Sequence, residues 1–527
     1  MKPLALKILP DDAASVKDGW QIHRQRDFRG CETQALLPEA VGRNQLLRME
    51  NVLLFSTGYL SSFFELDAAV ITGATPGVCL ALAFGGAYNA YFAPGDGNVY
   101  TSALDTSNDL PLNVSAGTAR AVANAYISGI EKPVMFLGKQ YCTNPNPDNT
   151  KNGILNLTDF TTISIPGKTI RKLRVYTNRL WAVNSDGTIQ ISDNGDATVW
   201  NPLNILWLPN QEPALDFVPV QGGAIVYGAS SIYAMYGADY RDITFVPLQL
   251  GKRLTGANAE SNGVVYILST EGIYATTLNA AALQPHSQQE FFKSIFPMLT
   301  ASPQSITAVH LQKFYAILYT WPVQYGGTQS LLYYYLNNGY SKGNLLLPQE
   351  CPMTLALNDI NTDFLFGQSA GTLVKSTYPS RDLQKPHMAV LQTRHEDADS
   401  TRQKEWKEFA VTVHDAVFGA SIDAFLDYSP YPIAIASNVI LSAGDNIFVL
   451  NNASGLTPGN NFPRARTISI RLTFNNGATV STILANDTTG NLLKSETTGN
   501  YLTFDSTPGD FLIQELRLKY ALAGPDV

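Results

Sequence analysis

Short runs of apolar and aromatic residues, separated by Gly, Asn, Asp and Pro, occupy almost the whole chain. Such runs are typical of β-strands joined by tight turns, whereas a helix needs apolar residues at every third or fourth position. Helical spacing is present only in three short segments, residues 10–19, 114–130 and 279–296. The pattern therefore predicts an all-β protein with few and short helices.

A unit of strand, tight turn and strand repeats along the first three quarters of the chain. One copy is Leu180–Ile191, in which Gly187 occupies the turn. A small or Gly residue at this point supplies the positive φ of a tight hairpin. The equivalent turn residues are at positions 97, 187, 231, 272 and 371, with weaker matches at Gly138 and Gly327.

Neighbouring turns lie 41 to 55 residues apart, close to the roughly 40–50 residues of a four-stranded propeller blade. A hairpin alone cannot bury its apolar face, whereas blades packed around a ring bury both faces. We therefore predict a β-propeller of six or seven blades over residues 46–390.

The pattern changes at residues 391–408, the most charged stretch of the chain, which we interpret as a solvated domain junction. Beyond it, residues 467–474 and 511–520 include alternating apolar and polar positions, as in strands with one wet face. We predict a C-terminal β-sandwich over 391–527. Residues 1–45 are predicted to form an N-terminal arm packed on this sandwich.

Composition limits the classes of function. Hydrophobic residues make up 45% of the chain, which excludes global disorder, and the formal charge is −8, which opposes general nucleic-acid binding. Charged residues are only 15%, against roughly 25% in ordinary domains. A surface with few charges and many aromatic residues suits either a β-rich protein or one covered by neighbouring subunits.

Candidate chemistry is sparse. Gly367–Gly371 matches G-x-S-x-G, but the residues after it indicate a strand instead of the helix that a hydrolase needs. Ser192–Trp200 is similar to the Asp-box turn of sialidase-like propellers, a folding motif without a catalytic role. No P-loop or G-x-G-x-x-G is present. We predict no catalytic residue and no cofactor.

Metal binding is also weakly indicated. His395, Glu396, Asp397 and Asp399 have suitable donor atoms, but a charged junction explains them as well. The cysteines, at positions 31, 79, 142 and 351, form no CxxC pair or Cys/His cluster. We predict buried free thiols and no metal site.

One basic cluster, residues 23–29, lies near the N-terminus. Its Arg24, Arg26 and Arg29 suit contact with DNA phosphates or with an acidic partner, although a surface strand of mixed charge is the simpler interpretation. We name these three arginines, together with Trp406 at the junction, as candidate interface residues.

Several segments resemble one protein family. Arg174–Trp181, continued to Trp200-Asn201-Pro202, resembles the blade of short-tailed bacteriophage tail proteins, as does Gly228–Gly237. Leu47–Leu53 with Gly58-Tyr59-Leu60 resembles their entry segment, and Ile513–Tyr520 resembles their final strand. The chain departs from the family at Ser61–Phe64, where many relatives have an Arg-Pro-Gly turn.

The family is the tail nozzle, also called the packaged-DNA stabilisation or tail tubular protein. The resemblance implies a homohexameric ring in the virion tail, assembled in the host cytoplasm, below the portal and adaptor rings. Its gated channel would retain the packaged DNA and pass it during ejection, with transient non-specific contact to the duplex. It also implies a sandwich platform on the adaptor, contacts to tail fibres or spikes, no membrane insertion and no catalysis.

Two alternatives remain open at this point. A propeller of this kind also suits a glycan-binding receptor protein, which would have aromatic and carboxylate residues in a pocket on the propeller axis. A propeller glycosidase is the other alternative and would bring titratable groups together in the same pocket.

Overall fold

The computed structural model describes the chain in separate stretches. These are residues 21–29, 31–32, 45–54, 58–62, 65–72, 81–83, 89–92, 98–103, 117–118, 120–124, 134–144, 153–156, 161–165, 168–284, 306–322, 328–345, 351–354, 364–367, 373–377, 388–397, 402–414, 417–450, 463–475, 480–483, 503–506 and 512–522. Contacts divide the chain into two compact units: a first unit of residues 1–63, 339–341 and 381–527, and a propeller unit of residues 64–338 and 342–380.

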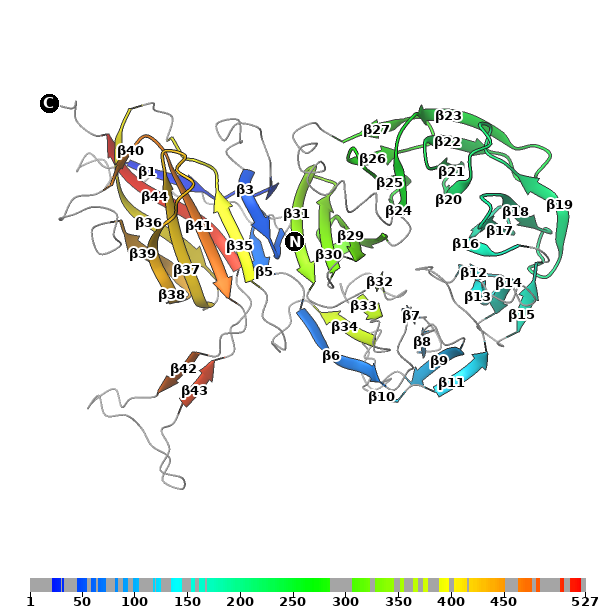
Figure 1. Ribbon diagram of the computed structural model, residues 1–527, viewed down its shortest axis with the longest axis horizontal. Coiled ribbons are helices and arrows are strands. Elements are labelled where there is room, and N and C mark those ends of the chain that lie inside the picture. The colour runs from blue at the N-terminus through cyan, green and yellow to red at the C-terminus, as the bar shows by residue number, and fades with distance from the viewer. Residues whose placement is uncertain are drawn as a thin grey trace, which may run out of the picture. The chain divides into compact units, whose positions relative to one another are not determined.

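In the residues that the structure describes, the propeller unit has seven groups of paired strands that follow one another around a ring (Figure 1). Five are separate four-stranded sheets. They comprise β7 (Ala81–Ala83), β8 (Asn89–Phe92), β9 (Asn98–Ala103) and β11 (Arg120–Asn124); β12 (Val134–Phe136), β13 (Lys139–Asn144), β14 (Gly153–Asn156) and β15 (Thr162–Ser164); β16 (Ile170–Tyr176), β17 (Arg179–Asn184), β18 (Ile189–Ser192) and β19 (Trp200–Leu206); β20 (Ala214–Val220), β21 (Gly223–Gly228), β22 (Ser231–Tyr236) and β23 (Thr244–Leu250); and β24 (Leu254–Ser261), β25 (Val264–Ser269), β26 (Ile273–Thr276) and β27 (Ala281–Leu283).

The other two sheets complete the ring. One contains β28 (Thr307–Leu311), β29 (Ala316–Pro322), β30 (Thr328–Tyr334) and β31 (Gly339–Leu345), with a 3₁₀ turn at Gln312–Phe314. The last joins β32 (Cys351–Thr354), β33 (Phe364–Gly367) and β34 (Leu373–Thr377) to β6 (Glu65–Thr72), beside which β10 (Gly117–Thr118) lies. Because β6 comes from the start of the unit and β32–β34 from its end, this sheet closes the ring.

The apolar core of the propeller lies between neighbouring sheets. Trp181 of β17 stacks on Phe217 of β20, with ring centroids 4.9 Å apart, inside a cluster that fills the space between these two sheets. Similar clusters lie on the other side of β16–β19 and between β20–β23 and β24–β27. The sheets β16–β19 and β20–β23 thus bury apolar residues on both faces, which together with the strand order confirms the predicted all-β propeller.

The turns on which the repeat was recognised are mostly equivalent in the fold. Positions 187 and 272 lie between the second and third strands of their sheets, and Ser231 is the first residue of a third strand, β22; positions 97, 327 and 371 fall outside the described residues. Gly138 is different, because it lies between the first and second strands, β12 and β13. Its φ of +76° explains the mistaken equivalence: both kinds of hairpin turn favour glycine.

The first unit contains two large, mainly antiparallel sheets and a small two-stranded sheet. One large sheet has the order β39-β36-β44-β5-β4, with β1 also paired to β44 and β40 to β36. Its strands are β1 (Gln21–Gln25), β4 (Val52–Leu54), β5 (Leu60–Ser62), β36 (Lys404–Val413), β39 (Gly444–Val449), β40 (Arg464–Ala465) and β44 (Leu512–Leu522).

In the second large sheet of this unit, residues 339–341 of β31 lie beside β2, and the order continues as β2-β3-β35-β41-β37-β38. Its strands are β2 (Cys31–Glu32), β3 (Gln45–Glu50), β35 (Met388–Thr393), β37 (Val417–Leu426), β38 (Ile433–Leu441) and β41 (Ile468–Asn475); β42 (Val480–Ile483) and β43 (Thr503–Ser506) form the small separate sheet. The strands β3, β4 and β5, which the sequence pattern places at the start of the propeller, pair within this first unit. The packing of its two large sheets as a sandwich stays a prediction.

Two of the expected helices are wrong. Residues 120–124 and 281–283 form β11 and β27, since each is the fourth strand of a blade and hydrogen bonds to the strand before it decide its conformation. The segment 10–19 lies outside the described residues. Within the part of the chain that the structure describes, there is no helix long and apolar enough to cross a membrane.

Candidate functional site

The basic cluster lies on β1 and on the residues that follow it. The Nε of Arg26 donates to Glu515 of β44 at 2.9 Å, and Arg24 lies 3.6 Å from the same carboxylate. Arg29 donates to Asp27 at 2.8 Å, and this hydrogen bond holds the pKa of the Asp27 carboxyl below its usual value. These arginines therefore have acidic neighbours in their own unit, and their contact with DNA or a partner stays a prediction.

Arg24 and Arg26 border a face of the sheet β1-β44-β36-β39 that carries charges in its centre and apolar residues toward β39. We call it the outer face. Strand register places Lys519, Glu408 and Val449 in one row, Arg24, Arg517, Ala410 and Ile447 in the next, and Glu515, Thr412 and Asp445 in a third. Ile447 is 59% exposed and Val449 45%, so this face offers apolar surface to a partner beside a mixed set of charges.

Trp406, the fourth candidate interface residue, is fully buried. Its indole N–H donates to the carbonyl of Ala465 at 3.2 Å, and Tyr520 lies against its ring with centroids 5.3 Å apart. Because no part of the indole is exposed, Trp406 stabilises its own unit and does not present its ring to a partner.

The charged stretch around residue 396 is less solvated than we expect from its composition. The Glu396 carboxylate is only 2% exposed and accepts two hydrogen bonds from Arg394, at 2.8 and 2.9 Å, while His23 lies 3.1 Å away. Burial opposes ionisation, but the contacts with His23 and Arg394 lower the pKa of Glu396. Lys404 is also buried, donating to the carbonyls of Arg402 and Arg466. The prediction of a solvated junction is therefore wrong for these side chains, which are buried because backbone and charged partners satisfy them.

His395 lies against Tyr428, with ring centroids 4.3 Å apart, and burial lowers the pKa of the imidazole to about 4. Asp399 falls outside the described residues. Over the described ranges, no group of three or more His, Cys, Asp or Glu side chains is placed to hold a metal ion. Cys31 and Cys142 are buried free thiols, as predicted; Cys79 and the side chain of Cys351 are not described.

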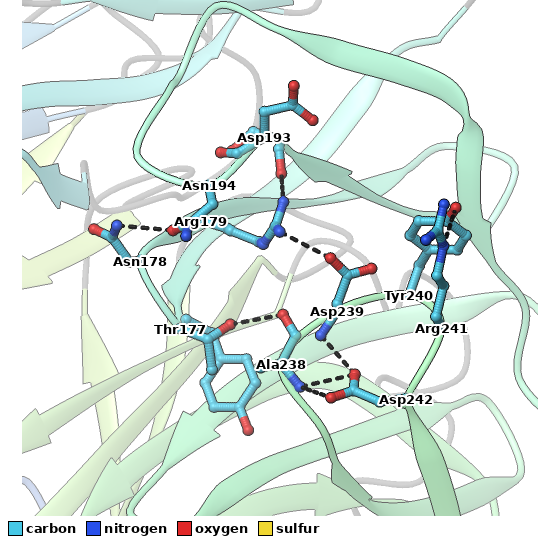
Figure 2. Close-up of polar contacts among 12 residues, drawn as sticks. Thr177, Asn178, Arg179, Asp193, Asn194, Ala238, Asp239, Tyr240, Arg241 and Asp242 are labelled. Carbon is cyan, nitrogen blue, oxygen red and sulfur yellow. Dashed lines mark hydrogen bonds and ion pairs between the residues drawn. The ribbon is translucent and has the colours of Figure 1, made fainter.

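The Asp-box turn forms part of a polar cluster on one face of the propeller (Figure 2). It connects β18 to β19, and the side chain of Asn194 accepts a hydrogen bond from Asn178 at 2.8 Å. Arg179 binds the Ser192 carbonyl and Asp239 of the next sheet, each at 2.8 Å. This cluster joins two blades at their turns.

The loop of the neighbouring blade is fixed by its own carboxylate. Asp242 accepts hydrogen bonds from the backbone N–H groups of Ala238 and Asp239, the latter at 2.7 Å, and the Thr177 hydroxyl donates to the Ala238 carbonyl (Figure 2). The carboxylates of Asp239 and Asp242 thus already have donors within the cluster. This geometry indicates that the cluster holds two blades together and favours that role over acid–base catalysis by the two carboxylates.

A second polar connection lies deeper, on the first strands of three consecutive sheets. The Asp216 carboxylate of β20 is fully buried and accepts from Arg174 of β16 at 2.8 Å and from Asn258 of β24 at 2.6 Å. Asn258 also donates to the Tyr227 hydroxyl at 2.7 Å. These contacts fix three blades to one another.

The G-x-S-x-G match is followed by a strand, as the sequence indicates. Gly367 ends β33, residues 368–371 lie outside the described residues, and the chain continues as β34 antiparallel to β33. A hydrolase elbow needs a helix after the serine, whereas the next described element here is a strand.

Comparison with known proteins leaves the family open. No family model matches the chain, and no curated protein matches it. Among solved structures, it is similar to the WD40 β-propeller domain of Doa1, at 12% identity and a TM-score of 0.39, covering 60% of this chain and 98% of that one. It is also similar to BBS1N in complex with ARL6DN, at 13% identity and a TM-score of 0.37, covering 61% of this chain and 97% of that one. The fold assignment rests on the strand pairing described above.

Sequence reasoning missed the partners of the basic cluster and the outer face that they border. Glu515 is 489 residues from Arg26 in the chain, so no local pattern connects them. The alternation in 444–449 and 512–522 was the available signal, because it places Asp445, Ile447 and Val449 on one side of a strand.

Proposed function

We propose that this protein is a structural component of a short bacteriophage tail, the nozzle below the portal and adaptor rings. In this proposal copies of the chain form a homohexameric ring whose channel retains packaged DNA and passes it during ejection. The ring binds the adaptor and tail fibres or spikes, contacts the duplex only transiently, and carries out no catalysis.

The main support for the proposal is that the residues resembling the nozzle family lie in the core and in the contacts between blades and strands. Trp181 fills the space between two blades, Arg174 pairs with the buried Asp216, and Trp200 donates its indole N–H to Ala197 in the Asp-box turn at 2.8 Å. The final family-like segment is the strand β44, which pairs with β1, β5 and β36. Residues that resemble the nozzle family thus determine this fold, which supports a role as a scaffold.

Charge supports the same role. A net charge of −8 repels DNA phosphates, so a channel lined by this chain would let a duplex slide with little binding. The ion pairs of Figure 2 join strands and blades, and such positions favour stiffness over proton transfer.

The test is the mass and symmetry of the full-length protein, by native mass spectrometry and negative-stain imaging, alone and with the adaptor protein of the same virion. A six-fold ring with an axial hole that binds the adaptor ring supports the nozzle. A propeller that stays monomeric when the adaptor is supplied refutes it, and glycan-array binding by that monomer would favour the receptor-binding alternative.

A further inference from the structure

Two open strands, β1 and β39, are at opposite sides of one part of the sheet in the first unit. Across this part the order is β39-β36-β44-β1, and every neighbouring pair is antiparallel. In the part of the chain that the structure describes, β1 pairs only with β44 and β39 only with β36. Directions alternate across four strands, so β1 and β39 run antiparallel to each other.

This arrangement allows the sheet to continue from one copy into the next. If the β39 strand of a second copy lies beside β1, the alternation of directions is unbroken. Open edges of this kind are templates for pairing with another chain. The contact uses two different edges, so it is head-to-tail and can close into a ring.

The two edges lack two of the devices that normally prevent such pairing, a proline and a β-bulge. Outer strands of the propeller carry a proline, Pro202 in β19 and Pro247 in β23, which removes a backbone donor from the edge. Neither β1 nor β39 contains a proline, and both pair with their inner neighbours without a bulge. Ile447 and Val449 are nonetheless exposed on β39, which is costly unless something covers them.

Side-chain chemistry selects the register between copies. Within one copy, Ile22 shares its row across the sheet with Val449, and Arg24 shares its row with Ile447. Continuing these rows places Ile22 beside Val449 of the next copy and Arg26 beside its Asp445. Arg26 is 51% exposed and Asp445 48%, so both ends of the contact join complementary groups.

We propose that β1 of one copy pairs antiparallel with β39 of a second copy, in the register that brings Ile22 to Val449 and Arg26 to Asp445. The inference deepens the proposed function, on which it rests for the closed ring, by naming the edges that join neighbouring subunits. In the ring, β1 of each copy thus binds β39 of one neighbouring copy, and its β39 binds β1 of the other neighbour.

A pair of cysteines tests the register in the full-length protein. Ile22→Cys and Val449→Cys are combined in one chain and oxidised mildly, and the products are separated on a denaturing, non-reducing gel. Within one copy the two positions are three strand spacings apart, about 14 Å, too far for a disulfide, which needs Cα atoms within about 7 Å. We expect a ladder of covalent dimers, trimers and larger rings, which reducing agent abolishes.

Three controls keep the test specific. Each single cysteine variant should show no more cross-linking than the wild type, because a head-to-tail contact needs both edges. Ile22→Cys combined with Leu203→Cys, which is 82% exposed on β19, should give no ladder. If the first pair disturbs folding, judged by circular dichroism, Arg26→Cys with Asp445→Cys tests the same register.

The outcomes separate this inference from the nozzle proposal. Strong cross-linking by a single variant, or no ladder from either pair, overturns the edge pairing even if native mass shows a ring that binds the adaptor. A ladder from the double variants supports the pairing, and if the resulting ring does not bind the adaptor, the nozzle proposal alone fails.

Discussion

Two ion pairs of equal length connect the sheet β16–β19 to the sheet β20–β23, and they differ in burial. Arg174–Asp216 and Arg179–Asp239 both measure 2.8 Å. The Asp216 side chain is 0% exposed, whereas the Asp239 side chain is 40% exposed. The same chemical change, Asp→Asn, therefore measures what burial adds to one kind of contact.

Asp216→Asn should be the costly substitution. It removes one partner of a buried pair, which costs about 3–5 kcal/mol, and it turns an amide N–H₂ toward the donors of Arg174 or Asn258. Because the Arg174 side chain is 21% exposed and keeps some water, we expect the lower end, about 3 kcal/mol. Asp239→Asn should cost about 0.5 kcal/mol, as in other exposed pairs.

Calorimetry of the purified full-length variants measures the difference. With about 2–4 °C for each kcal/mol, the Tm of the propeller transition should fall by about 6–12 °C for Asp216→Asn and by about 1–2 °C for Asp239→Asn. Arg174→Met combined with Asp216→Asn should lose less than the sum of the single losses. Equal shifts for the two aspartates would refute the argument that burial decides the strength of these contacts.

Three further predictions concern single positions. Gly187→Ala should destabilise the propeller by more than about 2 kcal/mol, since φ is +81° and the new Cβ would lie 2.2 Å from Pro213. Gly263→Ala has a similar φ of +79° but lies in open space, so it should cost only about 1–2 kcal/mol. Urea unfolding measures both losses, and similar values would contradict this reasoning. Burial lowers the pKa of His395 to about 4, so its contribution to the free energy of unfolding is present above pH 6.5 and lost as the pH falls toward 4; His395→Gln should flatten that part of the stability curve, and an unchanged curve would disprove it. Burial raises the pKa of the Cys31 thiol well above its usual value, so mass-spectrometric mapping should find it alkylated only after unfolding; labelling in the native state would count against its burial.

The sequence predicts the propeller because the tight turn of each blade favours glycine or another small residue, and such residues recur at a nearly constant spacing. Positions 187, 231 and 272 identify equivalent turns for this reason, while Gly138 is misassigned because another turn of the blade has the same preference for glycine. Strand pairing between distant segments leaves no such local trace. The pairing of β1 with β44, and with it the neighbour of Arg26, follows only from the fold.

Burial of charge was equally hard to predict. Glu396 and Lys404 stand in a stretch whose composition is typical of solvent-exposed loops. They are buried because Arg394, His23 and backbone carbonyls surround them, and two of these partners, His23 and the Arg466 carbonyl, come from distant parts of the chain. Trp406 shows the reverse error: an aromatic residue beside charges suggested an interface, but the strand places it inside.

The chain order of the first unit has a consequence for synthesis on the ribosome. β1 comes from its N-terminal part and β44 from its C-terminal part, with the whole propeller between them in the sequence. At about 5–20 residues per second, the roughly 500 residues between β1 and β44 take about 25–100 s to appear. Until then β1 has no β44 to pair with. If β1 and β39 join neighbouring copies as we propose, a chain that stops before β44 lacks the sheet that holds these two edges and would not enter the ring.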